Sequence, residues 1–129
     1  MTAWYLDTSA ALKLVVDEAE SRALIAAVNA SRPSLVSCSL LETEMRRAAH
    51  RIPALTQRRA TELLERIDLY IPSAAVFTQA GLLPGPDLRS LDAIHLAVAL
   101  QLGVDALISY DKRMAEAAGE IGLAVAAPQ

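Results

Sequence analysis

Three aspartates stand beside or within apolar stretches, where a folded domain normally buries its chain. Asp7 follows a short apolar run, Asp92 lies inside the apolar segment 90–97, and Asp111 follows another such run near the end of the chain. A carboxylate beside a buried element loses hydration, and a partner such as a cation must offset that loss. Because the three are spread along the whole chain, we expect folding to gather them into one acidic pocket.

Such a pocket predicts a divalent metal ion. Carboxylates within a few ångströms of one another cannot all stay ionised without a counter-charge. A set of oxygen ligands suits Mg²⁺, with Mn²⁺ as a substitute, better than zinc, and no cluster of histidine and cysteine competes for the role. A metal ion held by two or more acids can lower the pKa of a bound water and polarise a phosphodiester.

A fourth acid is expected from the helix that follows the second strand, where Glu42 and Glu44 compete. Glu42 has a structural explanation, because it completes a capping-box pattern with Ser39 and stands four residues before Arg46. Glu44 has a weaker local partner. Helical periodicity alone does not separate the two residues, and we favour Glu44.

The elements that must position these acids alternate between strands and helices. Strands are expected at 3–6, 35–38, 69–71, 106–109 and 123–126. Helices are expected at 8–16, 18–30, 39–51, 53–67, 73–83, 90–103 and 111–118, with Thr8 and Ser90 as caps. This alternation predicts one domain, 1–129, with a three-layer α/β/α fold around a mostly parallel sheet of about five strands. Working residues of such sheets gather at the carboxyl ends of the strands, where Asp7 and Asp111 fall.

Composition is that of a folded domain, with 53% apolar and 21% charged residues. The net charge of -3 does not indicate nucleic-acid binding, but six arginines between positions 46 and 66 make that segment locally basic. The single cysteine, Cys38, excludes a disulfide framework. We find no secretory signal and no segment apolar enough to span a membrane, so we expect a cytoplasmic protein.

Four segments resemble, in order, the motifs of PIN-domain nucleases, above all the VapC toxins of bacterial toxin–antitoxin pairs. They are residues 5–10, 39–48, 89–97 and 109–114, and together they extend over nearly the whole chain. The second motif again favours Glu44. The resemblance implies Mg²⁺-dependent hydrolysis of RNA phosphodiesters by an endoribonuclease toxin, and its catalytic residues would be Asp7, Glu44, Asp92 and Asp111.

The resemblance also implies roles and partners. Asp7 and Asp92 would be the principal metal ligands, and the other two acids would complete the shell directly or through water. Ser9 and Ser109 would orient water, the latter at a position where the family often has threonine. A cationic rim would hold the RNA against an acidic pocket. The candidates for this rim are Arg46, Arg47, Arg51, Arg58, Arg59, Arg66, Arg89, Lys112 and Arg113.

A VapB-like antitoxin is the implied protein partner. It would lay an extended or helical segment over an apolar groove and block the acidic site. A homodimer, or a larger toxin–antitoxin hetero-oligomer, is implied as well.

Simpler explanations exist for single residues. Asp7 and Asp111 could merely cap the helices that follow them, and His95 could be a hydrogen-bonded core histidine. Two other functions compete. One is a haloacid-dehalogenase-like phosphatase or phosphotransferase with Asp7 as nucleophile, although its second acid is replaced by Ser9. The other is a non-catalytic PIN or receiver-like regulatory binding domain.

Overall fold

One parallel sheet forms the centre of the molecule. The computed structural model describes residues 2–129, and in this part of the chain five strands pair in the order β3-β2-β1-β4-β5. Every pairing is parallel, which confirms the expected sheet. The strands are β1 (Ala3–Leu6), β2 (Ser34–Cys38), β3 (Asp68–Tyr70), β4 (Ala106–Ile108) and β5 (Val125–Ala126).

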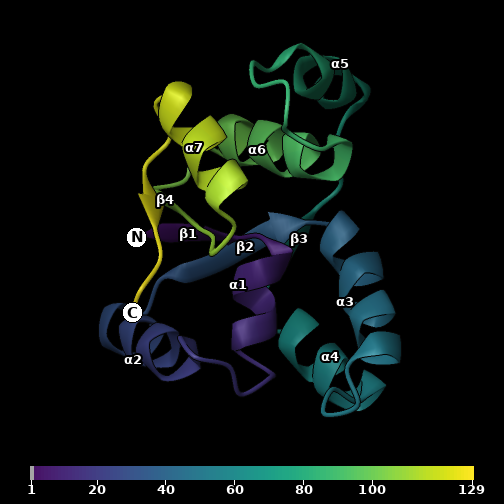
Figure 1. Cartoon of the computed structure of the whole chain (residues 1–129), viewed down its shortest axis with the longest axis vertical. Coiled ribbons are helices and arrows are strands. Elements are labelled where there is room, and N and C mark those ends of the chain that lie inside the picture. The colour runs from purple at the N-terminus through teal and green to yellow at the C-terminus, as the bar shows by residue number, and fades with distance from the viewer. Residues whose placement is uncertain (1) are drawn as a thin grey trace.

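Helices cover both faces of this sheet and complete the expected three-layer α/β/α fold. Helices α5, α6 and α7 lie on one side, and α1 to α4 lie on the other (Figure 1). Their bounds are α1 (Thr8–Lys13), α2 (Ser21–Ser31), α3 (Leu40–Arg51), α4 (Gln57–Leu64), α5 (Ala74–Leu82), α6 (Ser90–Leu102) and α7 (Lys112–Glu120).

Alternation along the central strands builds two cores. Tyr5 of β1 and Leu107 of β4 pack with the helices of the first side, whereas their neighbours Leu6 and Ile108 pack with α1, α3 and α4. All four side chains are fully buried. Successive side chains of a strand point to opposite faces, so a sheet covered on both sides has continuous apolar strands.

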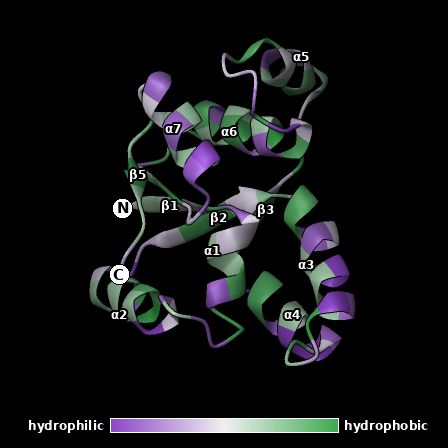
Figure 2. Cartoon of the chain, viewed as in Figure 1, coloured by the Kyte–Doolittle hydropathy of each residue, from purple (hydrophilic) through white to green (hydrophobic). Residues whose placement is uncertain are grey.

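Helix α6 is apolar on most of its circumference, as its mainly hydrophobic colour in Figure 2 shows. It packs against β2 beneath it and against α5 and α7 beside it, and its buried residues run from Ala93 through His95 to Ala99. A helix that is hydrophobic all round needs partners on several sides. This packing fixes the position of Asp92 in its first turn.

Several element boundaries differ from those expected. Helix α1 ends at Lys13 and is followed by a turn, so it is shorter than 8–16, and α4 is shorter than 53–67. Leu55 and Ile67 lie outside α4 but are buried. Within residues 2–129, none of the helices combines the length and the apolar character that crossing a bilayer requires.

The strand order places a crevice beside β1. The chain proceeds from β1 to β2 and β3 on one side, and then continues with β4 and β5 on the other side of β1. Ligands of open parallel sheets bind outside the carboxyl ends of the strands at such a reversal. The carboxyl ends of β1 and β4 therefore mark the place where a functional site is expected.

Candidate active site

Asp7 follows β1 directly and is held by three hydrogen-bond donors. Its Oδ1 accepts from Ser9 Oγ at 2.6 Å and from the Ala10 amide at 2.9 Å, and its Oδ2 accepts from Ser109 Oγ. The side chain is only 3% exposed. Asp7 is therefore the N-cap of α1, and the expectation that Thr8 caps this helix was wrong.

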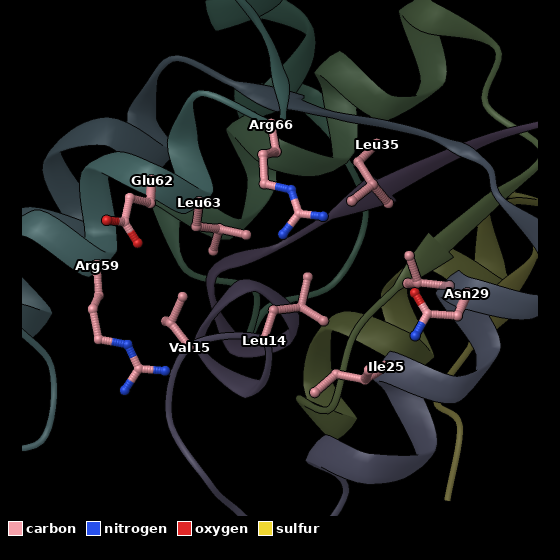
Figure 3. Close-up of a pocket in the computed structure, with 10 residues that line it drawn as sticks. Leu14, Val15, Ile25, Asn29, Leu35, Arg59, Glu62, Leu63 and Arg66 are labelled. Atoms are coloured by element: carbon pink, nitrogen blue, oxygen red, sulfur yellow. The ribbon is translucent and has the colours of Figure 1, made fainter.

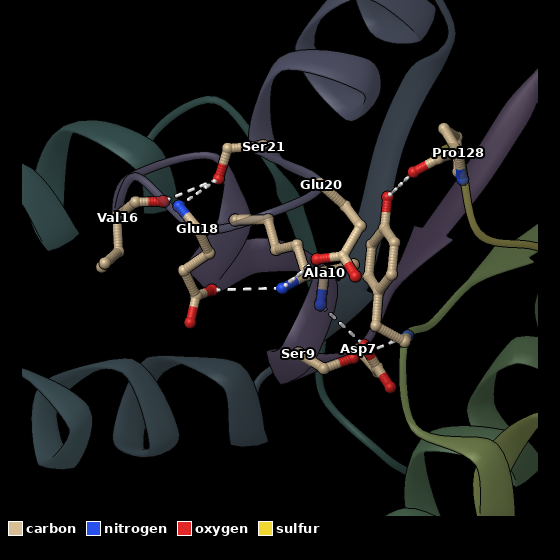
Figure 4. A network of polar contacts seen from close by, with 10 residues as sticks. Asp7, Ser9, Ala10, Val16, Glu18, Glu20, Ser21 and Pro128 are labelled. Atoms are coloured by element: carbon tan, nitrogen blue, oxygen red, sulfur yellow. Dashed lines mark hydrogen bonds and ion pairs between the residues drawn. The ribbon is translucent and has the colours of Figure 1, made fainter.

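The two serines tie Asp7 to the loop after β4, as Figure 4 shows for the Asp7–Ser9 contact. Ser9 Oγ accepts a hydrogen bond from the Tyr110 amide at 3.0 Å, and Ser109 Oγ accepts one from the Asp111 amide at 3.2 Å. Both hydroxyls thus orient the Asp7 carboxylate itself, whereas the sequence had suggested that they orient water.

Asp111 lies across the crevice and caps α7. Its Oδ1 accepts from the amides of Arg113 at 2.9 Å and Met114 at 3.3 Å. The simpler explanation of this residue as a helix cap is therefore confirmed. Both capping bonds end on Oδ1 of Asp111. Neither amide bonds Oδ2, so this oxygen can accept from another partner.

Asp92 is the residue that connects the acids electrostatically. It lies in the first turn of α6, whose N-cap is Arg89 and not Ser90 as expected. Burial raises the pKa of its carboxyl, and the negative charges of Asp111, Asp7 and Glu44 raise it further, while His95 opposes them. The charges of Asp7, Glu44 and Asp111 are therefore near enough to Asp92 to act on its carboxyl. We call these four residues, Asp7, Glu44, Asp92 and Asp111, the acidic crevice.

Glu44 and Glu42 point to different neighbours. Glu44 Oε1 lies 2.6 Å from His95 Nε2 on α6. Glu42 Oε2 accepts from Arg46 Nε at 2.6 Å, which confirms the expected pair along the helix. The expected capping box is not formed, because Ser39 has a helical backbone conformation and makes no side-chain cap bond. Glu44 therefore faces the acidic crevice, and Glu42 faces away from it.

His95 is a hydrogen-bonded core histidine, as its simpler explanation predicted. It is 1% exposed, and its Nδ1 lies 2.6 Å from the hydroxyl oxygen of Tyr5. Sequence reasoning did not single out Tyr5 as a functional residue. Its position two residues before Asp7 was the available signal, because residues i and i+2 of a strand share a face.

The donor set fits a hard divalent cation. Every acid of the crevice offers oxygen, the donor that Mg²⁺ and Mn²⁺ prefer. Burial also raises the pKa of Asp7, although its three hydrogen-bond donors act in the opposite direction. Within residues 2–129, no three Asp, Glu, His or Cys side chains stand close enough to hold one ion together.

The arginines between positions 46 and 66 do not form one rim. Arg46 connects α3 to α4 through Thr61 Oγ1 at 2.7 Å and the Gln57 carbonyl at 3.1 Å. Arg59 and Arg66 instead border a pocket of about 290 Å³ (Figure 3). The exposed cations that flank crevice residues in the sequence are Arg47, Arg89, Lys112 and Arg113.

This pocket lies between α1, α2 and α4, towards the amino ends of the strands. We call it the apolar groove, and its apolar lining consists of Leu14, Val15, Ile25, Val28, Leu35 and Leu63. Helical periodicity predicts that Ile25 faces inward with Leu24 and Val28, but its side chain is 42% exposed there. The reason is that no element of residues 2–129 covers the groove at Ile25.

Comparisons with known proteins agree with this architecture. The sequence matches the PIN domain over residues 4–120. It is 42% identical over 130 residues to ribonuclease VapC46 of Mycobacterium tuberculosis, with 99% of both chains covered.

Two solved structures share the fold. One is Mycobacterium tuberculosis VapC20, a toxin that cleaves the sarcin–ricin loop, with a TM-score of 0.73, 19% identity and coverage of 97% of this chain and 99% of that one. The other is VapBC2 from Rickettsia felis bound to promoter DNA, with a TM-score of 0.69, 12% identity and coverage of 99% and 100%. The match over residues 4–120 and the whole-length identity to VapC46 show that the chain belongs to the PIN-domain family.

Proposed function

We propose that this PIN-domain protein is a Mg²⁺-dependent endoribonuclease and the toxin of a VapBC-type toxin–antitoxin pair. The observation that carries the proposal is the 42% identity to ribonuclease VapC46 over the whole length. The charges of Asp111, Asp7 and Glu44, which act on the half-buried Asp92, support it. Acids whose pKa is raised by neighbouring acids are typical of functional sites. Identity over the whole length to a ribonuclease of the same family supports RNA as the substrate.

The acids of the crevice would share the work of holding the ion. Asp7 and Asp92 would bind it directly, and Glu44 and Asp111 would act directly or through water. Ser9 and Ser109 keep the Asp7 carboxylate in one orientation through their hydrogen bonds. When bound, Mg²⁺ would lower the pKa of water and polarise the phosphodiester.

An acidic crevice repels RNA, so nearby cations must offset the repulsion. Arg47 lies three residues after Glu44 and Arg89 three residues before Asp92, while Lys112 and Arg113 follow Asp111 directly. All four cations are exposed. They are the residues that would contact phosphates and set the register of the strand.

The phosphatase alternative is disfavoured by the residue two positions after Asp7. Haloacid-dehalogenase-like enzymes carry a second acid there, whereas this chain has Ser9, whose hydroxyl donates a hydrogen bond to Asp7 Oδ1. A non-catalytic domain is also disfavoured. The four acids repel one another, and a domain without a bound cation would have nothing that offsets this repulsion.

We infer that the antitoxin docks on the apolar groove. None of the four acids lines this groove, so a segment bound there would not by itself block the acidic site, as the resemblance had implied. Its lining is mainly aliphatic, with Arg59 and Arg66 at its border (Figure 3). Neither arginine forms an ion pair with another residue of the described chain, whereas the neighbouring Arg58 pairs with Glu62 at 3.3 Å. A partner segment that carries aliphatic side chains and a carboxylate would complement this surface.

The decisive experiment uses purified protein and total RNA. We expect cleavage with Mg²⁺, no cleavage with excess EDTA, and recovery when Mg²⁺ or Mn²⁺ is restored. The Asp92→Asn variant controls for a contaminating nuclease. Cleavage that persists in EDTA or in this variant would contradict the proposal.

A further inference from the structure

A series of two short hydrogen bonds connects three elements beside the acidic crevice. The Tyr5 hydroxyl on β1 lies 2.6 Å from His95 Nδ1 on α6, and His95 Nε2 lies 2.6 Å from Glu44 Oε1 on α3. Tyr5 and His95 are fully or almost fully buried. The two rings also meet edge to face, with centroids 5.7 Å apart and an interplanar angle of 78°. The imidazole is thus fixed both by its ring contact and by both of its nitrogens.

The direction of these bonds follows from the chemistry of the partners. A carboxylate only accepts hydrogen bonds, so the bond to Glu44 has His95 Nε2 as its donor. Burial raises the pKa of Tyr5, so its hydroxyl keeps its proton and can donate to Nδ1. A neutral imidazole has one donor and one acceptor nitrogen, and this arrangement satisfies both.

We propose that His95 is a positioning residue of the acidic crevice: its Nε2 hydrogen bond holds Glu44, and the Tyr5 hydroxyl selects the ring orientation that makes this bond. The proposal rests on the proposed function. His95 lies three residues after Asp92, so the two share one side of α6. The hydrogen bond therefore sets the position of Glu44 relative to Asp92, although these acids come from different helices.

The bond also selects which oxygen of Glu44 is used. Oε1 is occupied by His95, which leaves Oε2 for the ion or for its water. Partners that orient acidic or imidazole ligands in this way typically change metal affinity or activity about 10-fold to 100-fold when removed. A histidine that only filled the core would change stability and leave metal affinity unaltered.

Two substitutions separate the two nitrogens. The amide nitrogen of His95→Gln can take the place of Nε2 and keep the bond to Glu44, whereas the shorter His95→Asn can replace only Nδ1 and keep the bond to Tyr5. Both variants remove the imidazole and retain a polar amide in the core, so each controls for the other. Tyr5→Phe removes only the hydroxyl that orients the ring.

The readouts are the Mn²⁺ binding isotherm, measured by electron paramagnetic resonance, together with RNA cleavage and thermal unfolding. We expect His95→Asn to weaken Mn²⁺ binding about 10-fold to 100-fold, and His95→Gln to stay within about threefold of the wild type. Equal affinities of the two folded variants would overturn the proposal.

The nitrogen chemical shifts of His95 test the arrangement without any variant that must fold. We expect a protonated Nε2 and an unprotonated Nδ1 in the neutral ring of the wild type, and a change in this tautomer balance in Tyr5→Phe. A proton found on Nδ1 alone would overturn the proposal. Failure of the proposed function is distinguishable, because the wild-type protein would then neither cleave RNA nor bind Mn²⁺.

Discussion

The acidic crevice and the apolar groove lie at opposite ends of the same sheet and are built by opposite means. In the crevice, Asp7 at the end of β1 and Glu44 on α3 are fixed by hydrogen bonds that cross between elements, from Ser109 to Asp7 and from His95 to Glu44. In the groove, aliphatic side chains of the turn after α1, of α2, α4 and β2 face a pocket, and Ile25 stays partly exposed. The crevice is prearranged, whereas the groove is open.

This difference implies different consequences of mutation. A preorganised polar site loses its chemistry when one group moves by a small distance. An aliphatic surface loses affinity in proportion to the contacts removed and leaves the rest of the protein unchanged. Substitutions in the crevice should therefore affect cleavage, and those in the groove should affect the partner.

The largest effect is expected from Asp92→Asn. The amide keeps the shape of the side chain but removes a charge that would bind Mg²⁺, so we expect cleavage to fall at least about a thousandfold, or about 4 kcal/mol. Rates of RNA cleavage at saturating Mg²⁺ measure it. Asp7→Asn should lose activity to a similar degree, but it also places an amide against the donors Ser9 and Ser109, and it is therefore the less specific test. An Asp92→Asn variant within tenfold of the wild type would remove Asp92 from the metal site.

The second-largest effect on RNA cleavage is expected at Glu44 of α3, with Glu42 of the same helix as its comparison. We expect Glu44→Gln to reduce cleavage about a hundredfold, because it removes a crevice charge and alters the bond to His95. Glu42→Gln should stay within about threefold, because Glu42 pairs with Arg46 on the side that faces α4. Cleavage rates and melting temperatures of the two variants check this. An inactive Glu42→Gln beside an active Glu44→Gln would reverse the assignment.

A smaller and separate effect is expected in the groove. Ile25→Asp introduces a charge into the aliphatic lining, so we expect binding of the antitoxin to weaken about tenfold or more, with RNA cleavage by the free toxin unchanged. Ala26→Asp is the matched control, because the next residue of α2 is exposed and does not line the groove. Calorimetric titration with the antitoxin distinguishes the two variants. Equal affinity of both would place the antitoxin elsewhere.

The arrangement of the sheet and the positions of Asp7 and Asp111 were predictable from local patterns. Each of these residues follows a short apolar strand, and parallel strands end at one edge of a sheet. The helix caps were less predictable. Thr8 and Asp7 are both residue types that cap helices well. Asp7 caps α1 in the structure, where it is also held by Ser109, a residue far along the chain that no local pattern connects to it.

The distinction between Glu42 and Glu44 required the tertiary structure. Both residues border the same apolar stripe of α3, and only contacts with Arg46 and His95 separate them. His95 lies 51 residues from Glu44, so no local pattern could reveal this contact. The exposure of Ile25 had a similar cause, because helical periodicity identifies an apolar face but does not say whether the chain covers it.

The smallest effect concerns stability and pH in the metal-free protein. The pKa of Asp92 is raised above its ordinary value near 3.8, so above that value the folded state binds more protons than the unfolded state. The contribution of Asp92 to the free energy of unfolding therefore falls as pH rises through the window that begins there. Asp92→Asn escapes this loss, and we expect its melting temperature relative to the wild type to increase from pH 4 towards neutrality.

Thermal unfolding in EDTA across this pH range measures the difference, with the exposed Glu120→Gln as the control for loss of one negative charge. Mg²⁺ should shrink the difference at neutral pH, because it stabilises the ionised carboxylates of the wild type only. A difference that stayed constant with pH would mean that Asp92 is not strained by its acidic neighbours. The acidic crevice would then be like the apolar groove in one respect, because a bound cation would not stabilise the folded protein there.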